Sequence, residues 1–427
     1  MVVGALFISL AILLIVGVPV GFALGISSLV GIIAGGTQSI GFLSQTMVSG
    51  CDSFPILAVP LFVLAGEMMG GGGVSRRILD VFKAAFGRIY GGLAICTVAF
   101  CMFFAAVSGS GPATVAAVGA MVVPTMLAEG YDKSFTLALI ACAGGIGVII
   151  PPSIPMVFYG TSTGASIGNL FMAGMIPGIM IGFCLIGYCY YEGRKHHWKN
   201  EAEKFSWKKL GKALKDGFFA LLDPFIILGG IYSGVFTPTE AAAVAVFYGL
   251  FCGAVVYREL DFKKLMGVMK GAVSTTGTTM LIVGAATAFA KILSITGAPT
   301  AVASAISSVS DSKILILMLI NILLLIVGCF MDTTPAMLIL APILMPIATA
   351  MGVDIIHFGI IMVVNLAIGF ITPPLGINLF VSARVGDEPL STVIKGIIPF
   401  IIIMIVDLIL ITYIEAIPMT LVRLITS

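Results

Sequence analysis

Residues 146–178 of this chain recur, without a gap, at residues 368–400. The first copy reads IGVIIPPSIPMVFYGTSTGASIGNLFMAGMIPG, and the second reads IGFITPPLGINLFVSARVGDEPLSTVIKGIIPF. Each copy carries a Pro-Pro pair, Pro151-Pro152 or Pro373-Pro374, inside an otherwise apolar run. Proline cannot donate to the helical hydrogen-bond ladder and disfavours helix at the residue before it. The chain is therefore predicted to contain two related halves, each with a helix broken at the same place.

The composition indicates a membrane protein. Hydrophobic residues make up 59% of the chain and charged residues 10%, well below the ~25% charged residues of a soluble protein. Residues 1–51 and 134–191 carry no charge, and both stretches exceed the ~20 residues that one helix needs to span a bilayer. Long apolar runs favour helices over a β-barrel. We therefore expect an all-α polytopic membrane protein, with residues 2–17 as a retained first span and not a cleaved signal peptide.

Seven apolar runs follow one another in each half, in the same order. Those of the first half lie at 2–17, 20–34, 54–69, 89–107, 112–128, 136–168 and 173–191. Those of the second half lie at 218–236, 239–257, 272–293, 314–331, 336–352, 355–386 and 393–415.

The basic residues fix the expected orientation. Of 22 Lys and Arg residues, 8 lie between Arg194 and Lys215, and smaller clusters lie at 76–88 and 258–270. Placing all three clusters in the cytoplasm gives each half five crossings plus a hairpin. Because that number of crossings is odd, the two halves must run in opposite directions, which is an inverted-topology repeat. Matched, Pro-interrupted segments in such repeats are typical of the binding site of a secondary transporter.

The chain divides on this basis into two repeats and a connector. The first repeat covers 1–191, with scaffold helices 2–69, a hairpin at 89–128 and a broken helix at 136–168. A basic cytoplasmic connector follows at 192–217. The second repeat covers 218–427, with scaffold helices 218–293, a hairpin at 314–352 and a broken helix at 355–386. The hairpin tips lack the Trp, Tyr, Lys and Arg that anchor surface turns, so we expect both hairpins to be re-entrant.

The tips and the breaks supply backbone groups without helical partners. Carbonyl oxygens before a Pro-Pro break are suitable ligands for a hard cation such as sodium, and the half-helix after the break begins with free N–H groups that suit a carboxylate. Symmetry predicts one sodium site at the first tip and first break, and another at the second tip and second break. The predicted sodium ligands are Ser108, Ser110, Gly111, Gly147, Pro151, Asp332, Thr333, Thr334, Gly369 and Thr372. The predicted substrate-binding residues are Ser110, Thr114, Pro152, Ser153, Tyr159, Thr334 and Asn378.

Two of these assignments have a structural alternative. Ser, Thr and Gly also serve as small packing residues between membrane helices. Asp332 follows eighteen uncharged residues, and a buried carboxylate in hydrocarbon is costly, so we expect it to support a bound cation. A hairpin that reaches the surface would instead leave this acid in water. Elsewhere, Glu240 is expected to cap the helix that starts near Thr237.

The same residues carry a family resemblance. The string Gly229-Gly-Ile-Tyr-Ser-Gly-Val-Phe-Thr-Pro-Thr-Glu-Ala-Ala-Ala-Val244, together with SGSGPATVAAVGAMVVP at 108–124, GVIIPPS at 147–153 and GFITPPLGINLF at 369–380, resembles the large membrane subunit of tripartite ATP-independent periplasmic (TRAP) transporters. The resemblance covers essentially the whole chain. It implies the fold of the ion transporter superfamily and an elevator mechanism, in which hairpins and broken helices move as one body against a scaffold.

The resemblance also implies a function and partners. It implies sodium-coupled uptake of a small organic carboxylate across the bacterial inner membrane, with sialic acid favoured over C4-dicarboxylates. The substrate would be delivered by a periplasmic binding protein, and a separate small four-helix membrane subunit would complete the transporter. Besides membrane lipid, no further partner, nucleic acid or cofactor other than Na⁺ is expected.

Three other functions remain open on the sequence. A stand-alone cation-coupled anion symporter would share the architecture without needing a binding protein. An integral membrane enzyme would need a nucleophile with a base, or metal ligands on facing helices, and with three histidines in the chain we do not expect one. A purely structural subunit would not need two matched helix breaks.

Overall fold

The computed structural model describes residues 2–36, 38–87, 89–198, 206–297 and 312–426, and every regular element in these ranges is helical. Eight of the described helices are long and apolar enough to cross a membrane. Residues 199–205 of the predicted connector, and Arg88 of the first basic cluster, lie outside the described residues. The predicted all-α polytopic class is confirmed.

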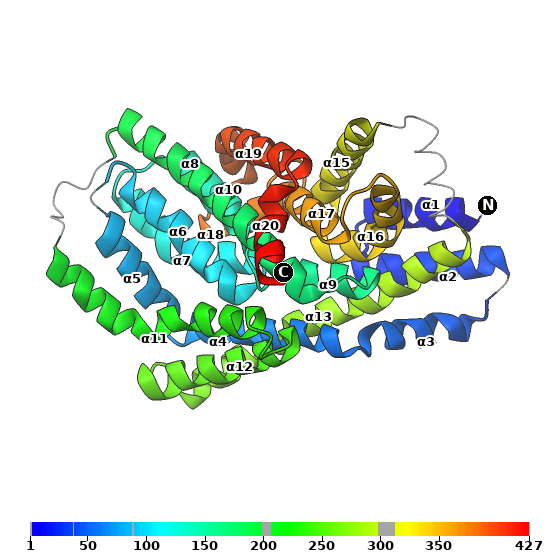
Figure 1. The fold of residues 1–427 in the computed structure, drawn as a ribbon, viewed down its shortest axis with the longest axis horizontal. Helices are drawn as coiled ribbons and strands as arrows, with labels where there is room; N and C mark the ends of the chain where they lie inside the picture. Colours follow the sequence, from blue (N-terminus) through cyan, green and yellow to red (C-terminus); the bar gives the residue numbers. More distant parts are fainter. Residues whose placement is uncertain (1, 37, 88, 199–205, 298–311, 427) are drawn as a thin grey trace.

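The helices fall into two groups in Figure 1. A lower layer contains α3 (Ile40–Cys51), α4 (Ala58–Gly71), α11 (Trp207–Tyr232), α12 (Pro238–Phe251) and α13 (Phe262–Ile295). At its right end α2 (Val20–Gly35) packs on α13, and α1 (Val2–Ile15) packs on α2, at the level of α16 in this view. Short helical turns, Phe54–Leu57 and Cys252–Val256, precede α4 and follow α12. As expected, Thr237 and Glu240 form a reciprocal capping box at the start of α12.

The upper group contains the predicted hairpins and broken helices. The first hairpin is α6 (Gly92–Ser108) and α7 (Gly111–Ala128), and the second is α15 (Lys313–Phe330) and α16 (Thr333–Ala350). The first broken helix is α8 (Lys133–Gly145), a short turn at Ile146–Val148, and α9 (Ile154–Thr163); the second is α17 (Ile355–Gly369) and α18 (Ile377–Val385). The peptide bond within each Pro-Pro pair is cis. Both predicted breaks and both hairpins are confirmed.

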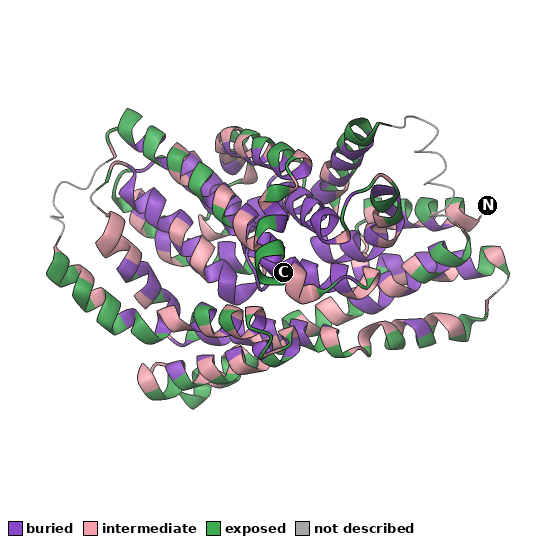
Figure 2. Ribbon diagram, in the orientation of Figure 1, coloured by how far each residue is buried: buried purple, intermediate pink, exposed green. Residues whose placement is uncertain are grey.

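Four further helices connect or cover these groups. The amphipathic α5 (Val74–Phe86) leads from α4 into the first hairpin. The long α10 (Ile167–Lys195) and α19 (Leu390–Tyr413) follow the two broken helices, and α20 (Ala416–Thr426) packs on α10. Figure 2 shows the buried residues concentrated in α8, α9 and α17, whereas α11 and α12 expose much of their surface. The broken helices therefore form the core of the molecule.

The two halves interlock at their broken helices. The last segment of the second broken helix, α18, packs on the first segment of the other, α8. Asn378 and Ser382 of α18 donate to the carbonyl oxygens of Ala141 and Leu137, at 3.0 and 2.6 Å. On the opposite side, the Tyr159 hydroxyl of α9 donates to the Ile355 carbonyl at 2.7 Å.

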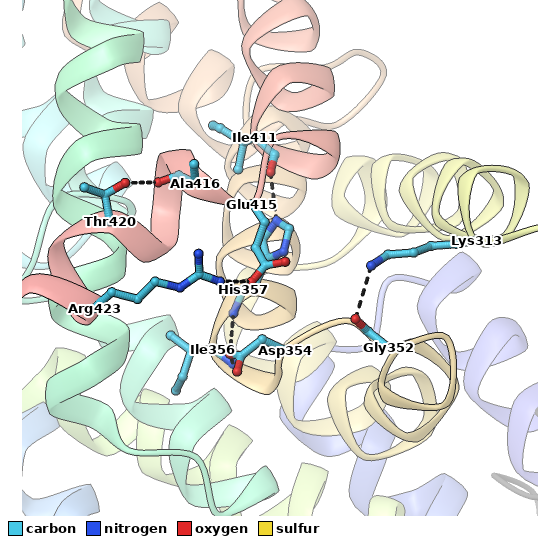
Figure 3. A network of polar contacts seen from close by, with 10 residues as sticks. All are labelled: Lys313, Gly352, Asp354, Ile356, His357, Ile411, Glu415, Ala416, Thr420 and Arg423. Carbon is cyan, nitrogen blue, oxygen red and sulfur yellow. Dashed lines mark hydrogen bonds and ion pairs between the residues drawn. The ribbon is translucent and has the colours of Figure 1, made fainter. Parts of the chain in front are cut away.

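A polar network fixes the start of α17 (Figure 3). His357 lies 2.8 Å, through Nε2, from the Ile411 carbonyl of α19, and Asp354 accepts from the N–H groups of Ile356 and His357. Lys313 donates to the Gly352 carbonyl at 3.1 Å, and an ion pair joins Glu415 to Arg423 of α20. The one buried histidine among the described residues is therefore part of the packing between α17 and α19.

Some helix boundaries differ from the sequence predictions. The apolar runs do not predict α3, because it is only 12 residues long and Ser44, Gln45, Thr46 and Ser49 interrupt its apolar residues. Helix α11 begins at Trp207, eleven residues before the predicted run, because Ser206 caps a helical segment whose lysines resemble those of a loop. The C-terminal helix α20 is also not predicted, because it is amphipathic and lies beyond the last apolar run.

Candidate functional site

The first hairpin turns at Gly109, whose φ of +62° suits glycine. Ser108 and Thr114 lie on either side of the turn with their hydroxyl oxygens 2.9 Å apart, and Thr114 donates to the Ser110 carbonyl at 2.8 Å. The tip touches the first break directly, because the Ile154 N–H donates to the Gly109 carbonyl at 3.3 Å. Oxygen atoms from the tip therefore converge beside the broken helix.

Gly147 completes this cluster. A Cβ added at Gly147 would lie 2.7 Å from the Thr114 hydroxyl oxygen and 2.9 Å from the Ser110 carbonyl oxygen. Only a residue without a side chain allows this approach. The structure therefore brings together three of the five residues predicted for the first sodium site, Ser108, Ser110 and Gly147, and adds Thr114, which was predicted to bind substrate. Of the other two, Gly111 faces the Phe370 ring of the second repeat, and Pro151 lies in the cis Pro-Pro bond.

The second hairpin turns at Asp332, which caps α16. Its carboxylate accepts from the Thr334 N–H at 3.3 Å and from the Thr333 hydroxyl at 3.1 Å. Gly369, at the second break, instead packs against the other arm of the hairpin, where a Cβ would lie 2.4 Å from the Gly328 backbone. The Thr372 hydroxyl, three residues beyond the end of α17, donates to the Ile368 carbonyl of that helix at 2.7 Å. Of the residues predicted for the second sodium site, Asp332, Thr333 and Thr334 therefore lie together at the hairpin tip. Gly369 and Thr372 instead make packing and backbone contacts at the second break.

A cavity of about 870 Å³ joins the two tips. One wall contains Ser108, Gly109, Ser110 and Pro112 of the first hairpin, with Asp332, Thr333 and Thr334 of the second. Helices α4 and α13, which run beneath both hairpins in Figure 1, form the opposite wall. The cavity extends along α13 to Lys264, in the third basic cluster.

The predicted substrate residues divide into two groups. Ser110 and Thr334 line the cavity. Thr114, Pro152, Ser153, Tyr159 and Asn378 are buried behind its wall, and none of them is in its lining. Ser153 caps α9 and donates to the Val148 carbonyl at 2.6 Å, while Tyr159 and Asn378 link the two repeats. In this conformation these buried side chains contribute to packing within and between the two broken helices.

Sequence reasoning missed the scaffold wall of the cavity. Its polar side chains are Glu67 of α4 and Lys264, Thr275 and Thr279 of α13. Thr275 and Thr279 share one face of α13, and the Thr279 hydroxyl donates to the Thr275 carbonyl at 2.9 Å. The run Ser274-Thr-Thr-Gly-Thr-Thr279 inside an apolar helix was the available signal. For Glu67 the signal was a lone acid in an apolar run.

The helix N-termini at the cavity are not equivalent. Asp332 caps α16 and Ser153 caps α9, so some of their N–H groups have partners. The N-cap of α7, Ser110, makes no side-chain cap, and Ser110, Pro112 and Ala113 all line the cavity. Since a helix N-terminus favours negative charge, the start of α7 is suited to an anion and the acid at the second tip to a cation.

Comparisons with known proteins identify the family of this chain. Residues 7–417 match the family described as "Tripartite ATP-independent periplasmic transporter, DctM component". The isethionate TRAP transporter permease protein DctMQ of Oleidesulfovibrio alaskensis is 47% identical over 97% of this chain, which spans 65% of that relative's length. The C4-dicarboxylate large permease DctM of Pseudomonas aeruginosa is 41% identical over 93% of both chains. The sialic acid large permease SiaM of Vibrio cholerae is 39% identical over 91% of both.

A solved structure has the same fold. The YdaH transporter of Alcanivorax borkumensis, whose topology is described as unusual, superposes with a TM-score of 0.61 at 16% identity and covers 87% of this chain and 88% of its own. At this level of identity the likeness concerns the fold alone.

Proposed function

This chain belongs to the family of large permease (DctM) components of TRAP transporters, a multi-pass family of the inner membrane, and on that premise we propose that it carries out sodium-coupled secondary uptake of a small organic acid. The family is one of transporter permeases and not of enzymes. The observation that carries the proposal is the cavity between the hairpin tips, where an uncapped helix N-terminus and a carboxylate lie on one wall.

The cavity offers complementary places for an anion and a cation. An acid anion would be held at the start of α7, where Ser110, Pro112 and Ala113 line the cavity and the first N–H groups of the helix have no partner within it. A sodium ion would be held at Asp332, with oxygen atoms of Thr333 and Thr334 as further ligands. A second ion would use the oxygen atoms of Ser108, Ser110 and Thr114 beside Gly147. Because each bound charge lowers the electrostatic cost of the other, binding would be mutually dependent.

The names of the relatives limit the proposed substrate to a chemical class, not to one compound. The relatives are named for isethionate, C4-dicarboxylates, sialic acid and 2,3-diketo-L-gulonate. All of these are small organic anions, so we propose an organic acid of this kind and retain sialic acid and C4-dicarboxylates as the carboxylate candidates. Isethionate, the sulfonate for which the 47% identical relative is named, is a third candidate.

The transport step is proposed to be an elevator movement. The hydrogen bonds from α18 to α8 and from α9 to Ile355 support a hairpin and broken-helix body that moves as a unit. The facing wall supports sliding, because Gly66, Gly70, Gly71 and Gly267 line the cavity there. The cavity reaches Lys264 at the basic end of the scaffold, so under the positive-inside rule this conformation faces the cytoplasm.

The proposed partners are a periplasmic binding protein that delivers the substrate and a small four-helix membrane subunit. The test is reconstitution of this chain with both partners in proteoliposomes under an inward sodium gradient, with sialic acid, succinate and isethionate as substrates. Accumulation of one substrate that needs all components, and that stops when potassium replaces sodium, is expected. Sodium-driven uptake without the binding protein would favour a stand-alone symporter, and uptake that ignores sodium would refute the coupling.

A further inference from the structure

The first three turns of α11, Trp207 to Phe218, carry two exposed rows of side chains. Lys208, Lys212 and Lys215 recur at i, i+4 and i+7, so they share one face of the helix and span about 10 Å along its axis. Trp207, Leu214 and Phe218 form a neighbouring apolar row, with exposed fractions of 78%, 42% and 52%. A basic row and an apolar row therefore lie side by side on the surface.

The opposite face of this segment is occupied. A Cβ added at Gly217 would lie 3.1 Å from a methyl group of Val81 on α5, and Ala220 is buried. On α5, the guanidinium group of Arg77 already has partners: it forms an ion pair of 2.8 Å with the Glu259 carboxylate and lies 3.8 Å from the centre of the Tyr257 ring. The packed face thus fixes the rotation of α11, and the lysine row must face outward.

The position of the segment identifies its surroundings. The basic turns lead directly into the apolar part of α11, from Phe218 onward. Helix α11 is not itself among the eight candidate membrane spans of the described residues, but it packs on α12, which belongs to one of them. A helical segment at the entry to an apolar helix, with lysines beside exposed Trp and Leu side chains, lies at the level of the lipid headgroups. Lysine stems there extend along the apolar surface and place the ammonium groups among the phosphates.

We propose that these three turns of α11 are a binding site for anionic phospholipid headgroups, with Lys208, Lys212 and Lys215 contacting phosphate and Leu214 and Phe218 contacting the acyl chains. Charge complementarity selects the lipid, because the segment from 207 to 216 contains four lysines and one aspartate. The occupant is a membrane lipid and not a soluble phosphate, since the apolar row has no role in binding a free ion.

The site has a route to the transport body. Helix α11 packs on α5, and α5 leads into the first hairpin within a few residues. A lipid bound at α11 would therefore lie beside α5, the helix that connects the scaffold to the first hairpin. The proposal does not depend on the substrate or on the coupling ion.

The sequence provides a reporter at the site. The chain has two tryptophans: Trp207 beside the lysine row, and Trp198, stacked on Tyr131 with ring centroids 4.7 Å apart. In the Trp198→Phe variant, Trp207 is the sole tryptophan. Nanodiscs of mixed phosphatidylglycerol and phosphatidylcholine, with bromine on the acyl chains of one lipid at a time, then report by fluorescence quenching which lipid occupies the site. Free glycerol phosphate serves as a soluble competitor.

The expected result is a preference of about fivefold or more for quenching by the brominated anionic lipid, the effect of about one well-placed lysine. Glycerol phosphate should not reverse it. Substituting glutamine for all three of Lys208, Lys212 and Lys215 should bring the preference close to one. The control substitutes glutamine for the exposed Lys270, Lys291 and Lys395; it removes the same charge elsewhere and should leave the preference unchanged.

Three results would overturn the proposal: equal quenching by both lipids, no quenching by either, or a preference that survives the triple Lys208, Lys212 and Lys215 substitution. The second would mean that protein covers this face. If Trp198→Phe does not fold, the difference between the unmodified chain and Trp207→Phe isolates the same Trp207 signal.

Discussion

Asn378, in the second repeat, donates a hydrogen bond of 3.0 Å to the carbonyl oxygen of Ala141, in the first. One helical turn later Ser382 does the same to Leu137 at 2.6 Å. On the other side of the body, Tyr159 of the first repeat donates to Ile355 of the second at 2.7 Å. Each broken helix thus lends its last segment to the other repeat, and the two copies form one body.

The first prediction concerns this interlock. Ser382→Ala and Tyr159→Phe each remove one buried hydrogen bond between repeats, so each should lower the free energy of unfolding by about 1 kcal/mol. The measurement is thermal unfolding of the purified protein in detergent. Thr278→Ala is the control, because that exposed hydroxyl bonds only to Ser274 of its own helix. Unchanged unfolding in both test variants would show that the cross-repeat bonds do not hold the body together.

The second prediction concerns the contact between Gly328 and Gly369. A methyl group at Gly369 would lie 2.4 Å from Gly328 backbone atoms, so Gly369→Ala should force α15 and α17 apart and destabilise the protein by about 3 kcal/mol. Gly277→Ala is the matched control, since nothing lies within 4 Å of that position; it should be neutral or stabilise by about 0.5–1 kcal/mol. Equal unfolding temperatures for the two variants would contradict the close packing.

Much of the fold could be predicted from sequence because its causes are local. The cis Pro151-Pro152 and Pro373-Pro374 pairs lie between helix segments as expected, and the apolar runs locate the hairpins. Helix α3 could not be predicted in this way, because Ser44, Gln45, Thr46 and Ser49 interrupt its apolar residues and leave no continuous run. The first turns of α11 resemble a loop in sequence, because their charge outweighs the capping signal of Ser206.

Only part of the site could be predicted, because some of its residues stand out in the sequence and others meet only in the folded structure. Ser108, Ser110 and Asp332 stand out in sequence because they interrupt apolar helices at the tips. Glu67 lies close to Gly271 of α13, with its carboxylate 3.5 Å from where a Cβ would be. Nothing in either helix alone indicates that pairing, which arises only when the scaffold folds. Asn378 shows the reverse error, because the sequence predicted that it binds substrate. In the structure its side chain forms a hydrogen bond between helices and does not line the cavity.

The third prediction tests the scaffold wall. Gly267 and Gly277 are exposed glycines of the same helix, and a Cβ at either would have no neighbour within 4 Å, but only Gly267 lines the cavity. Gly267→Phe should fill the passage and reduce uptake by tenfold or more, about the effect of a 1.4 kcal/mol change, while the protein stays folded. Gly277→Phe should leave uptake near that of the unmodified chain. Full uptake by the Gly267→Phe transporter in proteoliposomes would mean that substrate does not pass this wall.

The central claim is that the acid at the second hairpin tip holds a coupling cation together with the substrate. Asp332 and Asp354 both cap helices through main-chain N–H groups, but only Asp332 lines the cavity, while Asp354 belongs to the network of Figure 3. Asparagine caps helices as well as aspartate does, so Asp332→Asn and Asp354→Asn differ mainly in the place where charge is lost.

The most direct measurement is the sodium concentration that gives half-maximal substrate uptake in proteoliposomes containing the complete transporter. For Asp332→Asn it should rise by about tenfold or more, equivalent to losing about 1.4 kcal/mol of cation binding, and for Asp354→Asn it should stay within about twofold. The same sodium dependence in both variants as in the unmodified chain would contradict the account.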